Sequence, residues 1–529
     1  MSSETLPVPK MSTAKESESE AEFAFMNNEV PMTRGIFQEE DAEAQAGHKN
    51  ELLHAAPESH RGDTLNTIDW DGPGDPQNPM NWSSTKKITN IGVVSVLAFL
   101  SPLGSTITSP MSSDIMSTFG ITNTTIESFI TSVYLLGYVF GPLLLAPLSE
   151  IYGRTIIYHT CNFGFLIWTI ACALSNNIVS LIIFRFFAGL AGSAPMTIGA
   201  GSIADMVPLD KRGLAMMGWI MGPVLGPAFG PLIAGYLGQA KGWRWNFWLV
   251  SILAGLVFLG SLLLLQESYP YTILKKKTQR LQKETGNRSL RSSLDSGKDP
   301  KKLLQVSIVR PVKMLILLPI VALLSLYMAT MYGYQYLMFT TFPRVFEGTY
   351  GFSKSGIGLV YLGIGVGFLF ALVLSAALSD RLVKQLTKRN GGEPKPEYRL
   401  PLLFVGAALA PIGLFLYGWT ATKNIHWIVP IVGSAFLGAA SFTIIMPSLA
   451  YLVDAYTPYA ASATAAAIVS RSLLGALLPL AGNSMYDDLG VGWGTSLLVF
   501  IAVAFAPIPL VFWKFGESIR TSGISQRRL

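Results

Sequence analysis

The chain has 529 residues, of which 50% are apolar and only 14% are charged, and its formal net charge is +6. Soluble domains carry about one quarter charged residues, so this composition excludes an ordinary soluble domain and indicates a membrane protein. The basic residues lie in short connections between apolar segments and form no basic face with interleaved aromatic residues, which argues against a nucleic-acid partner. Cys161 and Cys172 fall in one apolar segment, where packing is a better explanation than a disulfide or a metal site.

The chain begins with a polar segment that carries no hydrophobic core. Residues 1–69 are rich in Ser, Glu, Ala and Asn and predict a disordered cytosolic tail. They show no basic stretch followed by a short apolar run, so we expect no cleaved signal peptide. Residues 70–87 begin with the turn-rich sequence WDGPGDPQNPMNW and form a cytosolic lead-in at the membrane surface. Two interpretations of this segment are open: an ordered structural lead-in to the first span, and a role in gating.

Apolar segments long enough to cross a bilayer recur from residue 88 almost to the C-terminus. We expect membrane spans at 88–111, 124–147, 155–175, 178–204, 213–238, 245–266, 314–340, 355–378, 401–420, 427–452, 459–482 and 494–514. Six spans, a polar stretch and six more spans predict an all-α membrane protein of two related six-helix bundles. The expected bundles cover 88–268 and 312–515, joined by a basic cytosolic loop at 269–311 and followed by a cytosolic tail at 516–529.

The distribution of Lys and Arg predicts the orientation, because positive residues stay on the cytosolic side. They collect in the central loop, after the eighth span and in the C-terminal tail, so both termini should be cytosolic. Asn123, in the sequon Asn-Thr-Thr, then lies on the outer side and is a glycosylation candidate.

The loop Ala146–Arg154, between the second and third spans, brings opposite charges to the membrane rim. Its tight turn at Gly153 places the Glu150 carboxylate and the Arg154 guanidinium where they can pair with each other and with a helix end. With Asp205, at the end of the fourth span, they could form a network that holds one conformational state. A permanently structural turn is the alternative. Asp380 and Arg381 form a weaker copy after the eighth span.

Two arginines lie within apolar spans. Arg185 is in the fourth span and Arg471 is near the middle of the eleventh. A charge in hydrocarbon costs several kcal/mol unless it faces a cavity or a partner, so both are candidates for a substrate cavity. The alternative for Arg185 is a purely structural bond to backbone carbonyls.

The fifth span carries glycine at every fourth position. Gly218, Gly222, Gly226 and Gly230 form a smooth stripe for close helix contact, and Pro223 and Pro227 bend the helix by removing backbone donors. The regular spacing predicts a packing and gating device rather than a substrate site. A generic kinked helix is the alternative.

The seventh span presents Met328, Tyr332, Gln335 and Phe339 at intervals of four, three and four residues, so they share one helix face. A wall of aromatic, amide and methionine side chains suits amphipathic or planar substrates. Ordinary packing between helices is the alternative.

Several of these segments resemble the major facilitator superfamily, and within it the fungal twelve-helix drug:proton antiporter type of multidrug and polyamine exporters. The lead-in at 70–82 looks like the segment before the first helix of that subgroup. Ala146–Arg154 is similar to the family loop Gly-x-Leu-x-Asp-x-x-Gly-Arg, with Glu150 in place of Asp. The glycine and proline stripe looks like the signature associated with antiporters. The resemblance, from Trp70 to the end of the twelfth span, implies a monomeric proton antiporter.

The expected function is export of a drug, fungicide, toxin or secondary metabolite across the plasma membrane by alternating access. The sequence has no nucleotide-binding loop, so an ion gradient must supply the energy, and the resemblance implies that the ion is the proton. We expect neither a cofactor nor an enzymatic activity. The alternatives are uptake of a small nutrient or polyamine, facilitated or proton-coupled, and a receptor without turnover. The proton carrier is open among four carboxylates, those of Asp114, Glu127, Asp205 and Asp454.

Overall fold

The computed structural model describes residues 66–295 and 300–521. The expected tail up to residue 65 and the basic residues Lys298, Arg527 and Arg528 lie outside the described residues. Within the described part, the only strands are β1 (Thr67–Ile68) and β2 (Arg291–Ser292), which pair in parallel with Thr67 opposite Arg291. The rest of the regular structure is helical, which confirms the all-α class.

The first group of helices covers the expected first six spans. It contains α3 (Ser84–Thr106), η4 (Ser109–Met111), α4 (Ser112–Thr118), α5 (Thr124–Phe140), the π-helical turn η5 (Gly141–Leu145), α6 (Ala146–Tyr152), α7 (Arg154–Ala173), α8 (Ile178–Gly192), α9 (Ala194–Met206), α10 (Leu209–Lys241) and α11 (Arg244–Leu264). Short polar side chains begin several of these helices: the side-chain Oδ1 of Asn123 accepts from the backbone amides of Thr125 and Ile126 at the start of α5.

A short 3-10 turn, η3 (Pro79–Asn81), precedes the first group in the chain. The second group covers the expected last six spans. The second group contains α14 (Pro319–Gly348), α15 (Lys354–Val360), α16 (Leu362–Arg389), η6 (Pro396–Arg399), α17 (Pro401–Thr422), α18 (Ile428–Ala455), η7 (Thr457–Tyr459), α19 (Ala460–Phe505) and α20 (Ile508–Thr521). Along the chain, the two groups are connected by α12 (Pro270–Thr285), β2 and α13 (Pro300–Leu317).

The helix α19 contains two spans that a glycine separates. With α20 it forms a run of 62 residues, which would be about 90 Å long if straight, against a hydrocarbon core of about 30 Å. Gly490 interrupts it with a φ of 72° and a ψ of 166°. The chain folds back there, since a Cβ at Gly494 would lie 2.7 Å from the Tyr486 ring. Ten runs of described helix are apolar enough to cross a bilayer, and the bent pair of α13 and α14 makes eleven. The fold-back at Gly490 divides one of these runs into two spans, which gives twelve.

The expected span 314–340 is wrong at its start. The structure breaks at Leu318, where α13 meets α14 at 96°. Leu318 has extended backbone angles (φ −110°, ψ 105°) because the following Pro319 disfavours the helical conformation at the residue before it. Residues 314–317 therefore belong to α13, which packs against α6 and η5 of the first group and against α19 of the second.

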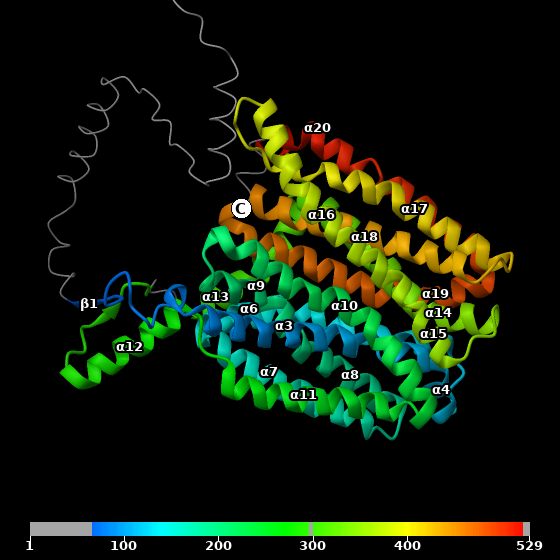
Figure 1. The fold of residues 1–529 in the computed structure, drawn as a ribbon, viewed down its shortest axis with the longest axis horizontal. Coiled ribbons are helices and arrows are strands. Elements are labelled where there is room, and N and C mark those ends of the chain that lie inside the picture. Colours follow the sequence, from blue (N-terminus) through cyan, green and yellow to red (C-terminus); the bar gives the residue numbers. More distant parts are fainter. Residues whose placement is uncertain (1–65, 296–299, 522–529) are drawn as a thin grey trace, which may run out of the picture. The chain divides into compact units, whose positions relative to one another are not determined.

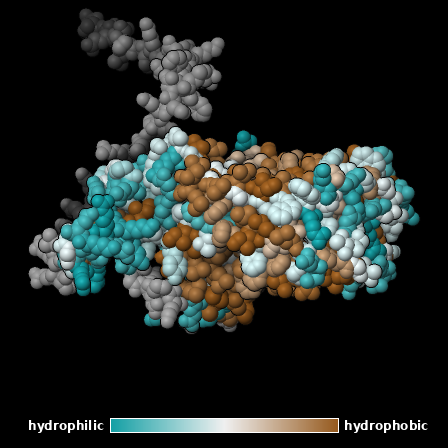
Figure 2. Space-filling model, turned by 90° about the horizontal axis from the view of Figure 1, so that it is seen from below, coloured by the Kyte–Doolittle hydropathy of each residue, from teal (hydrophilic) through white to brown (hydrophobic). Residues whose placement is uncertain are grey.

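An apolar belt covers the middle of the face seen in Figure 2. Figure 2 shows this belt between two polar ends. On α11 the exposed side chains of Ile252, Leu256, Leu259 and Leu263 follow intervals of four, three and four residues, so they form one outward face. This arrangement fits a helix that contacts lipid.

On the side of α10 and α16, the two groups meet near one end of their helices. We call the end where α3 begins and α20 finishes the basic end, and the end marked by α4, α15 and Gly490 the opposite end. In Figure 1 the ribbons of α10 and α16 lie together beside α15 and separate toward the basic end. A Cβ at Gly235 of α10 would lie 2.4 Å from the backbone of Lys354, which shows how closely the groups pack at the opposite end.

The lead-in before α3 is ordered. The backbone amides of Asp71 and Gln77 donate to the buried Asp75 carboxylate, and with Lys277 of α12 they hold its pKa below the usual value. Trp82 packs against the end of α9. These contacts favour the interpretation of this segment as a structural lead-in.

Candidate functional site

A row of serines runs along α3 and continues into η4. Ser101 and Ser105 lie one turn apart on α3, and Ser109, four residues further on, begins η4. Each shares a buried hydrogen bond with a tyrosine, and the pairs are Ser101 with Tyr138 (2.7 Å), Ser105 with Tyr336 (2.8 Å) and Ser109 with Tyr361 (2.7 Å). The last two tyrosines belong to the second group. This row is absent from the residues predicted above, although its four-residue interval is visible in the sequence.

Arg185 bonds to backbone carbonyls. It is 1% exposed, and its guanidinium donates to the carbonyls of Gly104 and Ser105 on α3 and of Ile130 and Thr131 on α5. The helix α3 ends just after Ser105, so its last carbonyls lack partners within the helix and a positive charge there is favourable. The structure thus places Arg185 as a tie between α3, α5 and α8.

Arg471 has a different environment. Its guanidinium carbon lies 5.2 Å from the centre of the Tyr332 ring, and its Nε is buried without a hydrogen-bond partner among the described residues. One turn further along α19, a Cβ at Gly475 would contact Tyr332 and also Leu135 of the first group. Arg471 therefore lies beside the contact between α5, α14 and α19.

The other expected members of the wall on α14 are packed inside the protein. Met328 and Phe339 are 0% exposed, and Gln335 is 4% exposed. Phe339 stacks on Tyr361, with ring centres 5.5 Å apart. Tyr332 is the half-buried residue of the expected set, and it is the one that meets Arg471.

A charge network lies at the basic end of the first group. The Nε of Arg154 is 3.2 Å from the Asp205 carboxylate, and the Arg154 guanidinium also donates to Ser149 and lies over the Tyr269 ring. Glu150, from the same loop, adds its negative charge near Asp205. The expected residues thus come together, with the direct ion pair between Arg154 and Asp205.

Glu267, which is not among the residues predicted above, joins this network. Its carboxylate accepts from the backbone amides of Arg154 and Thr155, so it caps the positive end of α7. Gly153 has a φ of 100°, and a Cβ there would lie 2.4 Å from Glu267. Only glycine fits this turn, because a side chain would be strained and would displace the capping carboxylate.

The second group repeats the network with a different arginine. Arg399 donates to Asp380 and pairs with Asp454, whose carboxylate lies 3.0 Å from its Nε. Arg381 is exposed and makes no ion pair within the described ranges. The counterpart of Arg154 is therefore Arg399, which lies in the turn before α17. Because Arg399 is outside the short segment that contains Asp380 and Arg381, comparing that segment with the first loop does not identify it.

An ion cluster joins the two groups at the opposite end. Lys354, at the start of α15, lies 2.7 Å from the Glu347 carboxylate, 3.7 Å from that of Asp114 and 2.6 Å from the Ser113 hydroxyl. Asp114 and Ser113 belong to α4 of the first group. Glu127, also at this end, accepts from Ser112.

We expect the Lys354→Met variant to open the opposite end more often, because it loses the charge that holds α4 against α15. The measurement is the distance distribution between spin labels at positions 122 and 423 in a variant without Cys161 and Cys172.

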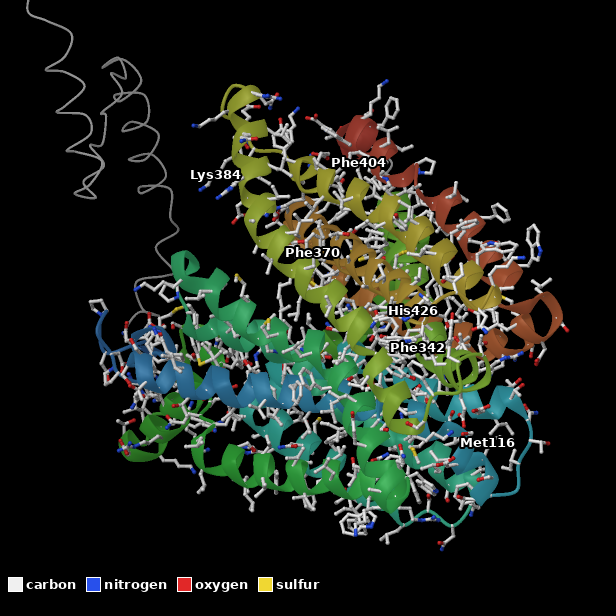
Figure 3. All side chains as sticks on the ribbon, turned by 45° about the vertical axis from the view of Figure 1, so that its right-hand side comes forward. Met116, Phe342, Phe370, Lys384, Phe404 and His426 are labelled. Carbon is white, nitrogen blue, oxygen red and sulfur yellow. The ribbon has the colours of Figure 1, made fainter. Side chains whose placement is uncertain are left out.

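A longer-distance population should appear with Lys354→Met and be weaker with Lys354→Arg. The matched control is Lys384→Met, because Lys384 is an exposed lysine of α16 that points away from the protein (Figure 3). Distributions identical to wild type in all three variants would contradict this role.

The glycine stripe of α10 packs on α3. A Cβ at Gly222, Gly226 or Gly230 would lie 2.6 to 2.8 Å from the α3 backbone, whereas a Cβ at Gly218 would meet nothing within 4 Å. Pro231 lacks the amide that would bond to the carbonyl of Pro227, and Thr106 of α3 donates to that carbonyl instead. Three of the four expected glycines thus form a close helix contact.

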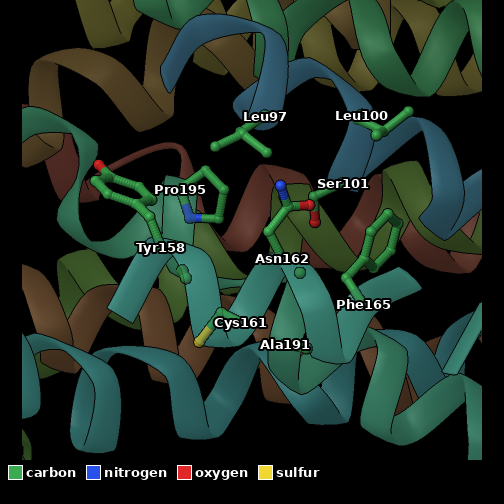
Figure 4. Close-up of a pocket in the computed structure, with 11 residues that line it drawn as sticks. Leu97, Leu100, Ser101, Tyr158, Cys161, Asn162, Phe165, Ala191 and Pro195 are labelled. Atoms are coloured by element: carbon green, nitrogen blue, oxygen red, sulfur yellow. The ribbon is translucent and has the colours of Figure 1, made fainter. Parts of the chain in front are cut away.

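A small cavity inside the first group is no cargo site. Figure 4 shows it between α3, α7 and the junction of α8 with α9, with Asn162 and Ser101 in its lining. Its volume is about 10 Å³, the space of one water molecule, whereas sites for organic ligands measure about 300–1,000 Å³. Both polar side-chain atoms of Asn162 lack a partner among the described residues, so a water here would satisfy them.

Comparison with known proteins gives the family. The sequence model of the Major Facilitator Superfamily matches residues 94–479. The chain belongs to the major facilitator superfamily. Like other members of this family it is a multi-pass membrane transporter of small molecules and not an enzyme.

The similar major facilitator proteins include several fungal transporters. The MFS-type transporter penM of Penicillium rubens is 56% identical over 86% of this chain and 90% of its own length. The efflux pump radE of Floropilus chiversii is 49% identical over 86% of this chain and 85% of its own length. Among solved structures, a D-xylose-proton symporter matches 82% of this chain and 98% of its own length with a TM-score of 0.62. At 18% identity it shows the fold alone.

Proposed function

We propose that this transporter exports small amphipathic organic molecules from the cytosol in exchange for protons. The observation that carries the proposal is the glycine stripe of α10, which packs on α3 and lies beside α15 at the contact between the groups. A smooth stripe lets one helix tilt over another without side chains that interlock. The sequence of this helix also resembles the antiporter signature, and one relative with 49% identity is named an efflux pump.

The proposed orientation places the basic end in the cytosol of a cell whose plasma membrane holds the protein. The contacts at the opposite end then close the outer side, so the structure corresponds to an inward-facing state. Transport would follow by rocking of the two groups, with the Arg154 and Arg399 networks breaking or forming at the inner rim.

The proton carrier is one of the four expected carboxylates. Asp114 and Glu127 lie at the opposite end, where external protons would arrive, and each contacts a polar partner. Asp205 and Asp454 lie in the inner networks. Neutralising any of them would weaken an ion pair or hydrogen bond that helps to hold one conformational state, which is how protonation would couple to movement.

We test the function by efflux from yeast cells that lack their own drug pumps and are loaded with fluorescein or rhodamine 6G. Cells that express the chain should lose at least one dye faster than cells that express the Asp205→Asn variant. A protonophore at constant ATP should abolish the difference, because the proton gradient is the proposed energy source. Equilibration that continues without a gradient, or accumulation of dye in the cells, would instead indicate facilitated diffusion or uptake.

A further inference from the structure

Arg471 is a positive charge at the centre of the membrane helices, and the described residues supply no counter-charge for it. Its Nε makes no hydrogen bond within the described part of the chain, and its nearest described partner is the Tyr332 ring. Arg185 provides the contrast, since its guanidinium donates to four carbonyls. A charge in hydrocarbon is expensive unless something pairs with it.

The helices around Arg471 contain no carboxylate at this depth. Neither Asp nor Glu occurs in residues 84–106, 128–149, 319–346 or 460–486, which cover most of α3, α5, α14 and the first part of α19. The acidic residues of these helices lie at their ends, where Glu347 bonds to Lys354 and Asp487 bonds to Arg344. Arg471 is only partly buried, so its guanidinium is accessible to a bound molecule that brings the counter-charge.

The surroundings of Arg471 also indicate the shape of that molecule. The rings of Tyr332 and Tyr336 lie 5.0 Å apart, and Tyr336 meets Phe339 with ring centres 5.4 Å apart. Tyr336 and Phe339 are buried, so the ring that remains accessible beside Arg471 is that of Tyr332. Aromatic faces bind planar apolar groups well, while a guanidinium binds carboxylate-like groups with two parallel hydrogen bonds.

We propose that Arg471 binds the acidic group of the cargo, so that the transported molecules are organic anions with a planar apolar body. The proposal rests on the proposed function, because it assigns a substrate class to the same transport site. It extends that function by excluding cationic drugs as the preferred cargo. Arg185 takes no part, because its donors already bond to the backbone.

The test is equilibrium binding to the purified full-length chain in lipid nanodiscs. The probes are 1-pyrenebutyric acid and its neutral amide, and the signal is energy transfer from tryptophan to pyrene. Wild type should bind the acid about tenfold or more tightly than the amide, because a hydrogen bond between charged groups contributes about 1.5–3 kcal/mol. The preference should disappear in Arg471→Gln and return in part in Arg471→Lys.

The matched control is Arg344→Gln, which removes an arginine of α14 that already pairs with Asp487 at the opposite end. This variant should keep the preference for the acid. Equal binding of acid and amide by wild type, no saturable binding of the acid, or a preference that survives Arg471→Gln would overturn the proposal. Binding needs no proton gradient, so a failure of export with the acid preference intact would count against antiport alone.

Discussion

Efflux by the Gly226→Leu variant is expected to fall about tenfold or more, with a lower melting temperature. Even the Cβ of a side chain at position 226 would lie 2.7 Å from the Phe99 carbonyl oxygen and 2.9 Å from the Leu103 amide nitrogen of α3. Both contacts are with backbone, so the helices α3 and α10 must move apart. Overpacking of this kind costs about 1–3 kcal/mol, and each 1.4 kcal/mol corresponds to a factor of ten.

The control is Gly218→Leu, one position of the same stripe where a Cβ would meet no atom within 4 Å. It should transport and melt like wild type. Dye efflux per folded molecule and thermal unfolding in detergent measure both effects. If the two leucine variants behave alike, the contact between α3 and α10 is not the reason for the glycine interval.

The Arg185→Met variant is expected to lose most of its folded protein, with a cost of about 3 kcal/mol or more. It would leave the carbonyls of Gly104, Ser105, Ile130 and Thr131 without their donor, and each unpaired buried group costs about 1–3 kcal/mol. Arg185→Lys should recover only part of this loss, since one ammonium cannot reach four carbonyls on two helices.

Thermal unfolding and the yield of monodisperse protein measure this effect, with Arg381→Met as the control because Arg381 is exposed and without an ion pair in the described ranges. A stable Arg185→Met protein that binds no cargo would show instead that Arg185 acts in the substrate cavity.

Much of the fold is predictable because hydropathy and glycine spacing are local properties. The apolar segments predict the helices, and the interval from Gly222 to Gly230 predicts a close helix contact. The break at Leu318 was also readable, since Pro319 follows it, but the apolar residues on both sides suggested one continuous span.

The missed parts of the site depend on contacts between distant residues. Glu267 reaches the turn at Gly153 across more than a hundred residues, and no local pattern marks a carboxylate as a helix cap from that distance. Arg399 replaces Arg381 for the same reason, because the turn before α17 brings it to Asp380 and Asp454. Arg185 and Arg471 look alike in the sequence. Their roles differ because the carbonyls at the end of α3 accept hydrogen bonds from Arg185, while Arg471 lies away from such carbonyls.

The closed opposite end is held by two kinds of contact that respond differently to external conditions: the hydroxyl pairs of the serine row, and a cluster of charges. Its bonds to Tyr336 and Tyr361 join neutral hydroxyl groups that are buried, so neither salt nor an ordinary change of pH alters their strength. Lys354 and its two carboxylates at the surface are the charged part of the same closure. The composition of the medium on that side would therefore change the opening rate through this surface cluster, while the buried hydroxyl pairs would respond little to it.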